Sequence, residues 1–389
     1  MSTPLIQNIA VFGESGSGKT VLLSSFFGAA QEPQNIAKSG FNVVAESSSQ
    51  STRLRQNFLG MKNSAKLPGP TRLKADSYSF IVKLKQKPNV QPVKSGSNDD
   101  LRLVWHDYPG EWFEQDVSGP GEATRRLETF RNLLGSDVAL LLVDGQRLLD
   151  NAGEEERYIK ALLSGFRNGL LLLKDDLLTG GKQLVQFPRI WILALSKSDL
   201  LPDMTVTAFS DLLVEKAGED INELRDVLAE FVESSDALSV GEDFVLLSSA
   251  KFVAGAIETS ERVGLDLVLP LAAVFPLERH VEWAKSKNIS KNVAAELMSG
   301  AVALADKLGG ARALGALLAR NSNKWLAAAG LLIATFGSGL DDFAKWGGVK
   351  LQEANAEAVA KQESLRATLT GFRLDLEKST EDQILHRRP

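Results

Sequence analysis

The sequence predicts an α/β fold, a doubly wound and mainly parallel sheet with a helical region at its C-terminal end. The apolar run at 138–143 has no polar residue on either face, as expected for a parallel strand that helices cover on both sides, and the run at 190–195 is the next strand of this kind. Segments with a helical pattern at 154–178 and 203–233 alternate with these strands. From about residue 277 the chain is rich in Ala, Gly, Leu and Lys, which indicates helices.

The chain has 389 residues, a net charge of −5 and no cysteine. This length has room for two domains, and we expect the composition change to divide the chain into segments 1–276 and 277–389. Without cysteine there are no disulfides or thiolate metal sites, and the acidic balance does not favour a nucleic-acid partner. We expect a cytoplasmic protein, since the longest uncharged apolar stretch, Trp325–Leu340, is shorter than the roughly 20 residues that a membrane span requires.

The first expected strand, Ile9–Phe12, leads into Gly13-Glu-Ser-Gly-Ser-Gly-Lys-Thr20, which fits the pattern G-x-x-x-x-G-K-[ST]. In such a loop the backbone N–H groups surround nucleotide phosphates at the start of a helix. Lys19 would reach the β- and γ-phosphates, and the hydroxyl of Thr20 would be a ligand of Mg²⁺. The residues expected to contact the nucleotide here are Gly13, Glu14, Ser15, Gly16, Ser17, Gly18, Lys19, Thr20 and Val21.

Two acids compete for the second, water-mediated contact with Mg²⁺, because Asp107 and Asp144 each close an apolar strand. Asp107 is favoured, since Asp107-Tyr-Pro-Gly110 fits D-x-x-G. The N–H of Gly110 can bond the γ-phosphate and so order a mobile loop.

A base-recognition site is expected after the strand at 190–195, where Ser196-Lys-Ser-Asp199 is similar to the N-K-x-D sequence of P-loop GTPases. The Asp199 carboxylate could accept hydrogen bonds from N1–H and the 2-amino group of guanine, while the stem of Lys197 covers the base. The alternative is an ordinary helix cap. After the strand at 244–247, Ser248-Ser-Ala-Lys251 is similar to the S-A-K loop of the same enzymes, in which a backbone N–H contacts the guanine carbonyl; this site would comprise Ser196, Lys197, Asp199, Ser249, Ala250 and Lys251.

With four motifs in this order, the chain resembles a P-loop GTPase of the translation-factor-related (TRAFAC) class over about residues 5 to 275. The segment Asp107-Tyr-Pro-Gly-Glu-Trp112 is similar to the D-Y-P-G-E-W signature of bacterial YcjX-like GTPases, which are stress-associated proteins. This resemblance implies a switch protein that binds GTP and GDP and hydrolyses GTP with Mg²⁺. The chain departs from the pattern at Ser196, which replaces asparagine and leaves the base selectivity open.

The catalytic residues are expected to be Lys19, Glu111 and one threonine. Glu111 follows the D-x-x-G glycine, where many GTPases resembling this one carry a glutamine that orients the attacking water; the alternative is a solvated loop acid. The polar segment 47–71 is the expected first switch, and Thr71 would bind both Mg²⁺ and the γ-phosphate, with Thr52 as the alternative. Arg72 is a weaker candidate for a charge stabiliser, and His106 is expected to be a packed strand residue.

The last expected helix carries an apolar stripe at steps of 4, 3 and 4 residues, formed by Leu365, Leu369, Phe372 and Leu376. We expect it to dock on the nucleotide-binding domain. Self-association through a short coiled-coil-like seam is the second possibility, and peripheral membrane contact through Trp325–Ile333 is the third. A protein effector could also bind through the C-terminal helices. Two rival functions remain, namely an ATPase on the same fold, favoured by Ser196 and opposed by Asp199, and a scaffold or membrane-surface assembly protein in which the nucleotide is structural.

Overall fold

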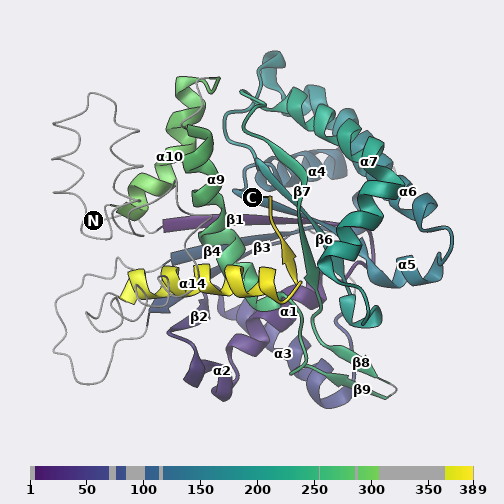
Figure 1. Cartoon of the computed structure of the whole chain (residues 1–389), viewed down its shortest axis with the longest axis vertical. Helices are drawn as coiled ribbons and strands as arrows, with labels where there is room; N and C mark the ends of the chain where they lie inside the picture. Colours follow the sequence, from purple (N-terminus) through teal and green to yellow (C-terminus); the bar gives the residue numbers. More distant parts are fainter. Residues whose placement is uncertain are drawn as a thin grey trace.

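A mixed sheet of eight strands forms the centre of the computed structural model (Figure 1). The structure describes residues 5–69, 76–84, 101–113, 117–253, 255–284, 288–305 and 364–388. The strands of the sheet are β1 (Leu5–Phe12), β2 (Phe41–Ala45), β3 (Asp76–Leu84), β4 (Leu101–Asp107), β5 (Val138–Asp144), β6 (Ile190–Ser196), β7 (Ser239–Leu247) and β10 (Leu385–His386). A separate hairpin consists of β8 (Lys251–Val253) and β9 (Ala256–Glu258).

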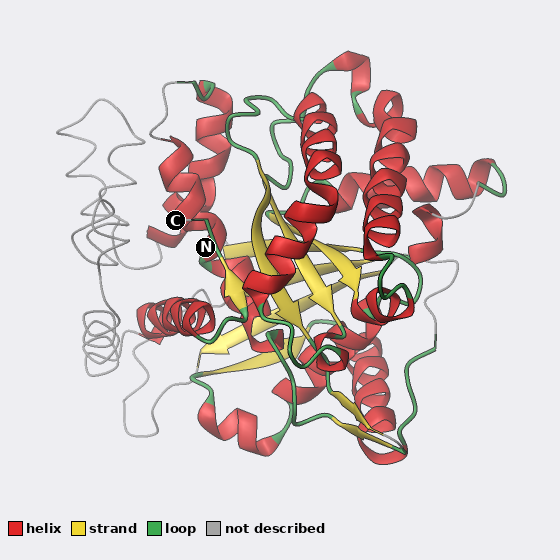
Figure 2. Ribbon diagram, turned by 45° about the vertical axis from the view of Figure 1, so that its right-hand side comes forward, coloured by secondary structure: helices red, strands yellow, loops and turns green. Residues whose placement is uncertain are grey.

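Helices lie on both faces of this sheet, as Figure 2 shows. They are α1 (Lys19–Ala30), α2 (Pro33–Lys38), α3 (Ser48–Ser64), α4 (Pro120–Leu133), α5 (Gly145–Asp150), α6 (Glu155–Leu177), α7 (Val206–Phe231), α8 (Val268–Ala273), α9 (Phe275–Ala284), α10 (Lys291–Ala305) and α14 (Ser364–Glu381). Short 3₁₀ helices are η1 (Gly110–Phe113), η2 (Thr179–Gly181), η3 (Ser198–Leu200) and η4 (Leu265–Leu267).

The strand order is β10-β7-β6-β5-β1-β4-β3-β2. The five strands from β7 to β4 run parallel, whereas β3 is antiparallel to both of its neighbours and β10 is antiparallel to β7. The predicted fold class, a doubly wound and mainly parallel sheet with helices, is therefore confirmed. Because the carboxyl ends of parallel strands meet at one edge, the segments that follow β1, β4, β5, β6 and β7 are brought together there.

Alternate side chains of the buried strands enter two different cores. On β5, Leu140 and Leu142 belong to a core that also contains residues of α1, α8 and α14, whereas Leu141 and Val143 belong to a core with residues of α4, α6 and α7. This alternation follows from the period of two in a strand. It explains why the predicted run at 138–143 has no polar position.

The polar segment expected to be the first switch contains a helix that the sequence analysis missed. Ser47 caps α3 by accepting a hydrogen bond from the N–H of Gln50 at 3.4 Å, and Phe58 is buried against α1 next to Gly28. The structure places Thr52, the alternative switch residue, on the exposed surface of this helix. Thr71 and Arg72 lie outside the described residues.

The C-terminal helix α14 docks on the same core as the sheet, as expected from its apolar stripe. Leu369, Phe372 and Leu376 are buried, and the ring of Phe372 meets that of Phe41 edge-on at 5.4 Å between centroids. The expected division at residues 276 and 277 runs through this core, because Leu277 also belongs to it. The stretch Trp325–Leu340 lies outside the described residues, and none of the helices within them is both long enough and apolar enough to span a bilayer.

A buried ion pair fixes the end of the chain beside β7. Arg279 of α9 donates to the Asp243 carboxylate at 2.8 Å and to the carbonyl of Arg388 at 3.2 Å. The N–H of Arg388 donates to the same carboxylate at 3.2 Å. Burial raises the pKa of Asp243, and the facing guanidinium opposes that shift. Together these contacts hold the short strand β10 at the edge of the sheet.

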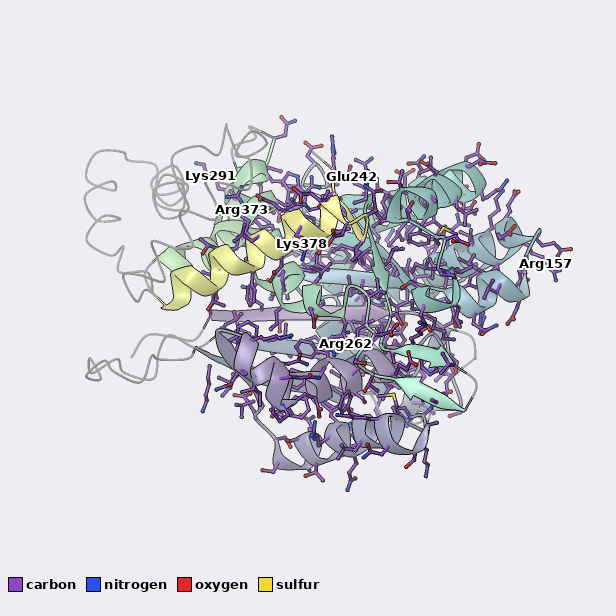
Figure 3. The ribbon with its side chains drawn as sticks, turned by 60° about the horizontal axis from the view of Figure 1, so that its bottom comes forward. Arg157, Glu242, Arg262, Lys291, Arg373 and Lys378 are labelled. Atoms are coloured by element: carbon purple, nitrogen blue, oxygen red, sulfur yellow. The ribbon has the colours of Figure 1, made fainter. Side chains whose placement is uncertain are left out.

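We expect Phe372→Ala to lower the free energy of unfolding by about 3–5 kcal/mol, because it leaves a cavity in the shared core. Lys378→Ala is the matched control on the same helix; Lys378 is exposed (Figure 3), so its loss should change stability by no more than about 0.5 kcal/mol. Urea unfolding of the full chain measures both values. Equal stabilities for the two variants would show that α14 is not part of the cooperative core.

Candidate functional site

The loop between β1 and α1 has the backbone geometry that a phosphate loop requires. Gly16 and Gly18 have φ values of +81° and +92°, which side-chain-bearing residues rarely adopt. Gly13 is closely packed, because a Cβ atom there would lie 2.7 Å from the Ser17 hydroxyl oxygen. The predicted glycines are thus required by the shape of the loop.

The ammonium of Lys19 points back into this loop and is almost fully buried. Its Nζ donates to the carbonyl of Gly13 at 2.7 Å and to the carbonyl of Glu14 at 3.0 Å. It also lies 5.0 Å from the centre of the Tyr108 ring, within the range of a cation–π contact. An anionic phosphate would be a stronger partner for the ammonium than these neutral groups.

Tyr108 is a site residue that the sequence analysis did not identify. Its hydroxyl accepts a hydrogen bond from the N–H of Gly13 at 2.9 Å and donates to the carbonyl of Gly13 at 3.1 Å. It therefore ties the D-x-x-G segment to the phosphate loop. In the sequence Tyr108 is one residue of the D-Y-P-G-E-W segment, and nothing in that segment indicates its contact with Gly13.

Gly110 lies directly against the phosphate loop. A Cβ atom on Gly110 would lie 2.4 Å from the backbone nitrogen of Ser15 and 2.5 Å from the carbonyl carbon of Glu14. Glu111, the next residue in η1, is partly exposed.

The far end of η1 is held by α4. Arg126 is buried and donates to the carbonyl of Trp112 at 3.0 Å. Its guanidinium also lies 5.7 Å from the centre of the Trp112 ring. The D-x-x-G segment and η1 therefore lie between α4 and the phosphate loop.

Oxygen ligands suitable for Mg²⁺ meet where α1 begins and β4 ends. The hydroxyl of Thr20 donates to Asp107 Oδ2 at 3.2 Å, and Asp107 is only 1% exposed. A hydroxyl and a carboxylate are oxygen donors of the kind that Mg²⁺ prefers, so these residues fit the ion. Asp144 lies elsewhere: Lys197 Nζ donates to its Oδ2 at 2.7 Å, and the N–H of Gln146 donates to its Oδ1 at 2.9 Å.

The expected base-recognition residues come together at the ends of β6 and β7. Asp199 accepts a hydrogen bond from the Ser248 hydroxyl at 2.7 Å and another from the N–H of Phe252 at 3.2 Å. Ser196 is buried and donates to the carbonyl of Val143 at 3.3 Å. Ser248, the first residue of the segment Ser248–Lys251, was not among the expected site residues, although its hydroxyl binds the Asp199 carboxylate.

The remaining predicted residues of this region lie on the loop after β7. Ser249 and Ala250 are buried, whereas Lys251 is exposed at the start of β8 and pairs with Glu261 at 3.1 Å. The structure therefore brings Ser249 and Ala250, but not the ammonium of Lys251, into the packed base of the loop.

His106 has the structural role that the sequence suggested. It lies on β4, and its Nδ1 shares a hydrogen bond with the Ser77 hydroxyl at 2.8 Å. Burial lowers its pKa to about 4, so the imidazole is neutral at physiological pH.

We compared the sequence and the structure with known proteins. No curated protein matches the sequence. Among solved structures, the signal recognition particle receptor complex SRb-GTP/SRX from Chaetomium thermophilum is similar, with 15% identity, 66% of this chain and 94% of that chain covered, and a TM-score of 0.32. The G domain of the FeoB iron transporter of T. maritima is also similar, with 12% identity and a TM-score of 0.22; the match covers 58% of this chain and 98% of that chain.

A third similar structure is Era of Aquifex aeolicus bound to GDP and aluminium fluoride, with 14% identity and a TM-score of 0.24; the match covers 74% of this chain and 69% of that chain. Likenesses at these scores support no inference about function. The family model of Double-GTPase 2 matches residues 7–243, which is more than half of the chain and includes the phosphate loop, the D-x-x-G segment and Asp199. The chain therefore belongs to the Double-GTPase 2 family of GTPases.

Proposed function

We propose that this protein binds GTP with Mg²⁺, hydrolyses it slowly, and acts as a switch whose output is a conformational state. The observation that carries the proposal is the convergence of the phosphate loop, the Thr20–Asp107 pair, Gly110 and Asp199 at one edge of the sheet. The phosphate loop follows β1 and Thr20 lies in the first turn of α1. Asp107 ends β4, Gly110 comes shortly after it, and Asp199 follows β6. The YcjX-like character suggested by the segment 107–112 is part of this proposal.

In the proposed mechanism the chain binds the triphosphate and Mg²⁺ through backbone N–H groups and three side chains. The N–H groups of the loop and the ammonium of Lys19 bind the phosphates, and Thr20 and Asp107 hold Mg²⁺. When bound, Mg²⁺ supplies positive charge at the β- and γ-phosphates. Glu111 orients the attacking water, and Thr71 provides the contact from the first switch.

The C-terminal helix α14 is the proposed receiver of the signal. It packs against β3, and Phe372 contacts Phe41 on β2. In the sequence, β2 precedes and β3 follows the segment that carries Thr71. If the γ-phosphate orders that segment, the change would be passed through these two strands to the residues of α14 that contact them. An effector or a second copy of the chain would then read the state of the C-terminal helices.

We expect GTP and GDP to bind far more tightly than ATP, because Asp199 matches the donors of guanine. Asp199→Asn should shift the preference to xanthine nucleotides, since its amide can donate to the oxygen that replaces the 2-amino group. Asp203→Asn, an exposed site four residues away, is the matched control and should retain the preference for guanine. Competition titrations measure these affinities, and equal binding of ATP and GTP by the unmutated protein would instead support the ATPase suggested by Ser196.

We expect Lys19→Ala or Thr20→Ala to abolish tight binding of GTP, because these residues contact phosphate and metal in the ground state. Glu111→Ala should slow hydrolysis by about 100-fold with little loss of affinity, since an oriented water matters mainly in the transition state. Glu128→Ala, at an exposed site on α4, is the control. Single-turnover hydrolysis separates the two effects; hydrolysis at the unmutated rate by Glu111→Ala would make Glu111 a simple loop acid. A nucleotide that stays intact through many assay times would favour a structural role.

We expect Gly110→Ala to weaken GTP binding by at least about tenfold, because its methyl group has no room beside Ser15 and would displace η1 or the loop. Gly121→Ala, in the first turn of α4, is the control, since the nearest atom to its added methyl is 3.7 Å away. Titration with GTP and GDP tests both variants. Unchanged affinities for Gly110→Ala would mean that the D-x-x-G glycine does not need its close approach to the loop.

A further inference from the structure

The phosphate loop contains an acid whose charge is balanced by an arginine from a different strand end. Arg147 of α5 lies 2.8 Å from Glu14 Oε2, and its second terminal nitrogen donates to the carbonyl of Ser15 at 3.4 Å. A carboxylate so close to bound phosphates would repel them, so the neighbouring guanidinium bears directly on how the loop binds an anion. Sequence patterns did not single out Arg147.

The position of Arg147 is set by rigid surroundings. Asp144 caps α5 through the N–H of Gln146, and the N–H of Asp144 itself donates to the Tyr158 hydroxyl at 2.9 Å. Gly145 is pressed against the end of β6, since a Cβ atom there would lie 2.7 Å from the carbonyl oxygen of Ser196. The start of α5 is thus fixed at the edge of the sheet, and only the side chain of Arg147 has to move to change partner.

Arg147 and Gly110 contact neighbouring parts of the phosphate loop. Gly110 packs on the peptide bond between Glu14 and Ser15, whereas Arg147 contacts the Glu14 carboxylate and the Ser15 carbonyl, which belongs to the next peptide. In the proposed function the N–H of Gly110 bonds the γ-phosphate. The guanidinium therefore lies within one side-chain movement of that phosphate group.

We propose that Arg147 is a catalytic residue that supplies positive charge to the γ-phosphate from within the same chain; this inference rests on the proposed function. On binding of GTP the guanidinium exchanges the Glu14 carboxylate for phosphate oxygens, which its planar donors can contact in pairs. During hydrolysis the water oxygen bonds to the γ-phosphorus. The bond from that phosphorus to the β,γ-bridging oxygen breaks, the electron pair stays on GDP, and the water proton passes to inorganic phosphate.

The test is a double-mutant cycle of Arg147→Gln and Glu14→Gln in the full chain. If Arg147 acts on the phosphate, Arg147→Gln slows single-turnover hydrolysis by about 1,000-fold or more, the range for arginine fingers. The loss is the same in the Glu14→Gln background. Affinity for GDP with aluminium fluoride falls in parallel, whereas affinity for GDP alone changes little.

Arg157→Gln is the matched control, because Arg157 lies at the outer end of the helical layer (Figure 3), its side chain is 81% exposed, and it pairs only with Glu154 among described residues. Its rate should equal that of the unmutated protein. If the double variant recovers the rate of Glu14→Gln alone, Arg147 merely neutralises Glu14 and the inference is wrong. Hydrolysis of GTP by the unmutated protein together with normal hydrolysis by Arg147→Gln overturns this inference alone, whereas no hydrolysis by the unmutated protein overturns the proposed function with it.

Discussion

A buried ammonium at the carboxyl end of β1 is the constraint on which the site depends. A charge removed from water is costly unless other groups compensate it. Lys19 is compensated by two carbonyls of its own loop and by the ring of Tyr108. These contacts require the loop to curl around the ammonium, and the positive φ values of Gly16 and Gly18 permit that curl. Positive φ values of this kind are typical of loops whose backbone N–H groups converge on an anion, which is what the proposed phosphate site requires.

The topology of the sheet brings two acids close to this loop, and their side-chain contacts distinguish them. Because β1 lies between β4 and β5, both Asp107 and Asp144 end near it, and the sequence alone left the choice open. The side chain of Asp107 meets Thr20, whereas that of Asp144 meets Lys197 at the end of β6. Asp144 thus orients the lysine expected to cover the base. In the proposed base site, this ion pair would hold Lys197 in place, in a chain where Ser196 replaces the asparagine of the N-K-x-D sequence.

The features that could be predicted from the sequence are local in the chain. The phosphate loop, each buried strand and each single motif depend on residues within a dozen positions, and the family match from 7 to 243 agrees with them. Helix α3 was missed because its surface is rich in Ser, Gln and Asn, and only Leu54, Phe58 and Met61 are buried. Tyr108 was missed because its partner, Gly13, is 95 residues away. Short-range periodicity carries no information about such a pair.

The two edges of the sheet are held by different kinds of contact. This difference affects how a conformational change in the proposed switch could reach the C-terminal helix. At the β7 edge, the ladder between β10 and β7 consists of two residue pairs, and the buried Arg279–Asp243 pair, which also binds Arg388, helps to hold the end of the chain there. Breaking one partner of a buried ion pair is strongly unfavourable, which makes this edge a poor moving part. At the other edge, β2 and β3 meet α14 through apolar contacts such as Phe41 with Phe372. These contacts involve no charge, although the buried Arg373 of α14 pairs with Glu278 of α9 at 3.4 Å; in the proposed switch, a nucleotide-dependent change would therefore reach α14 through β2 and β3 rather than through β10.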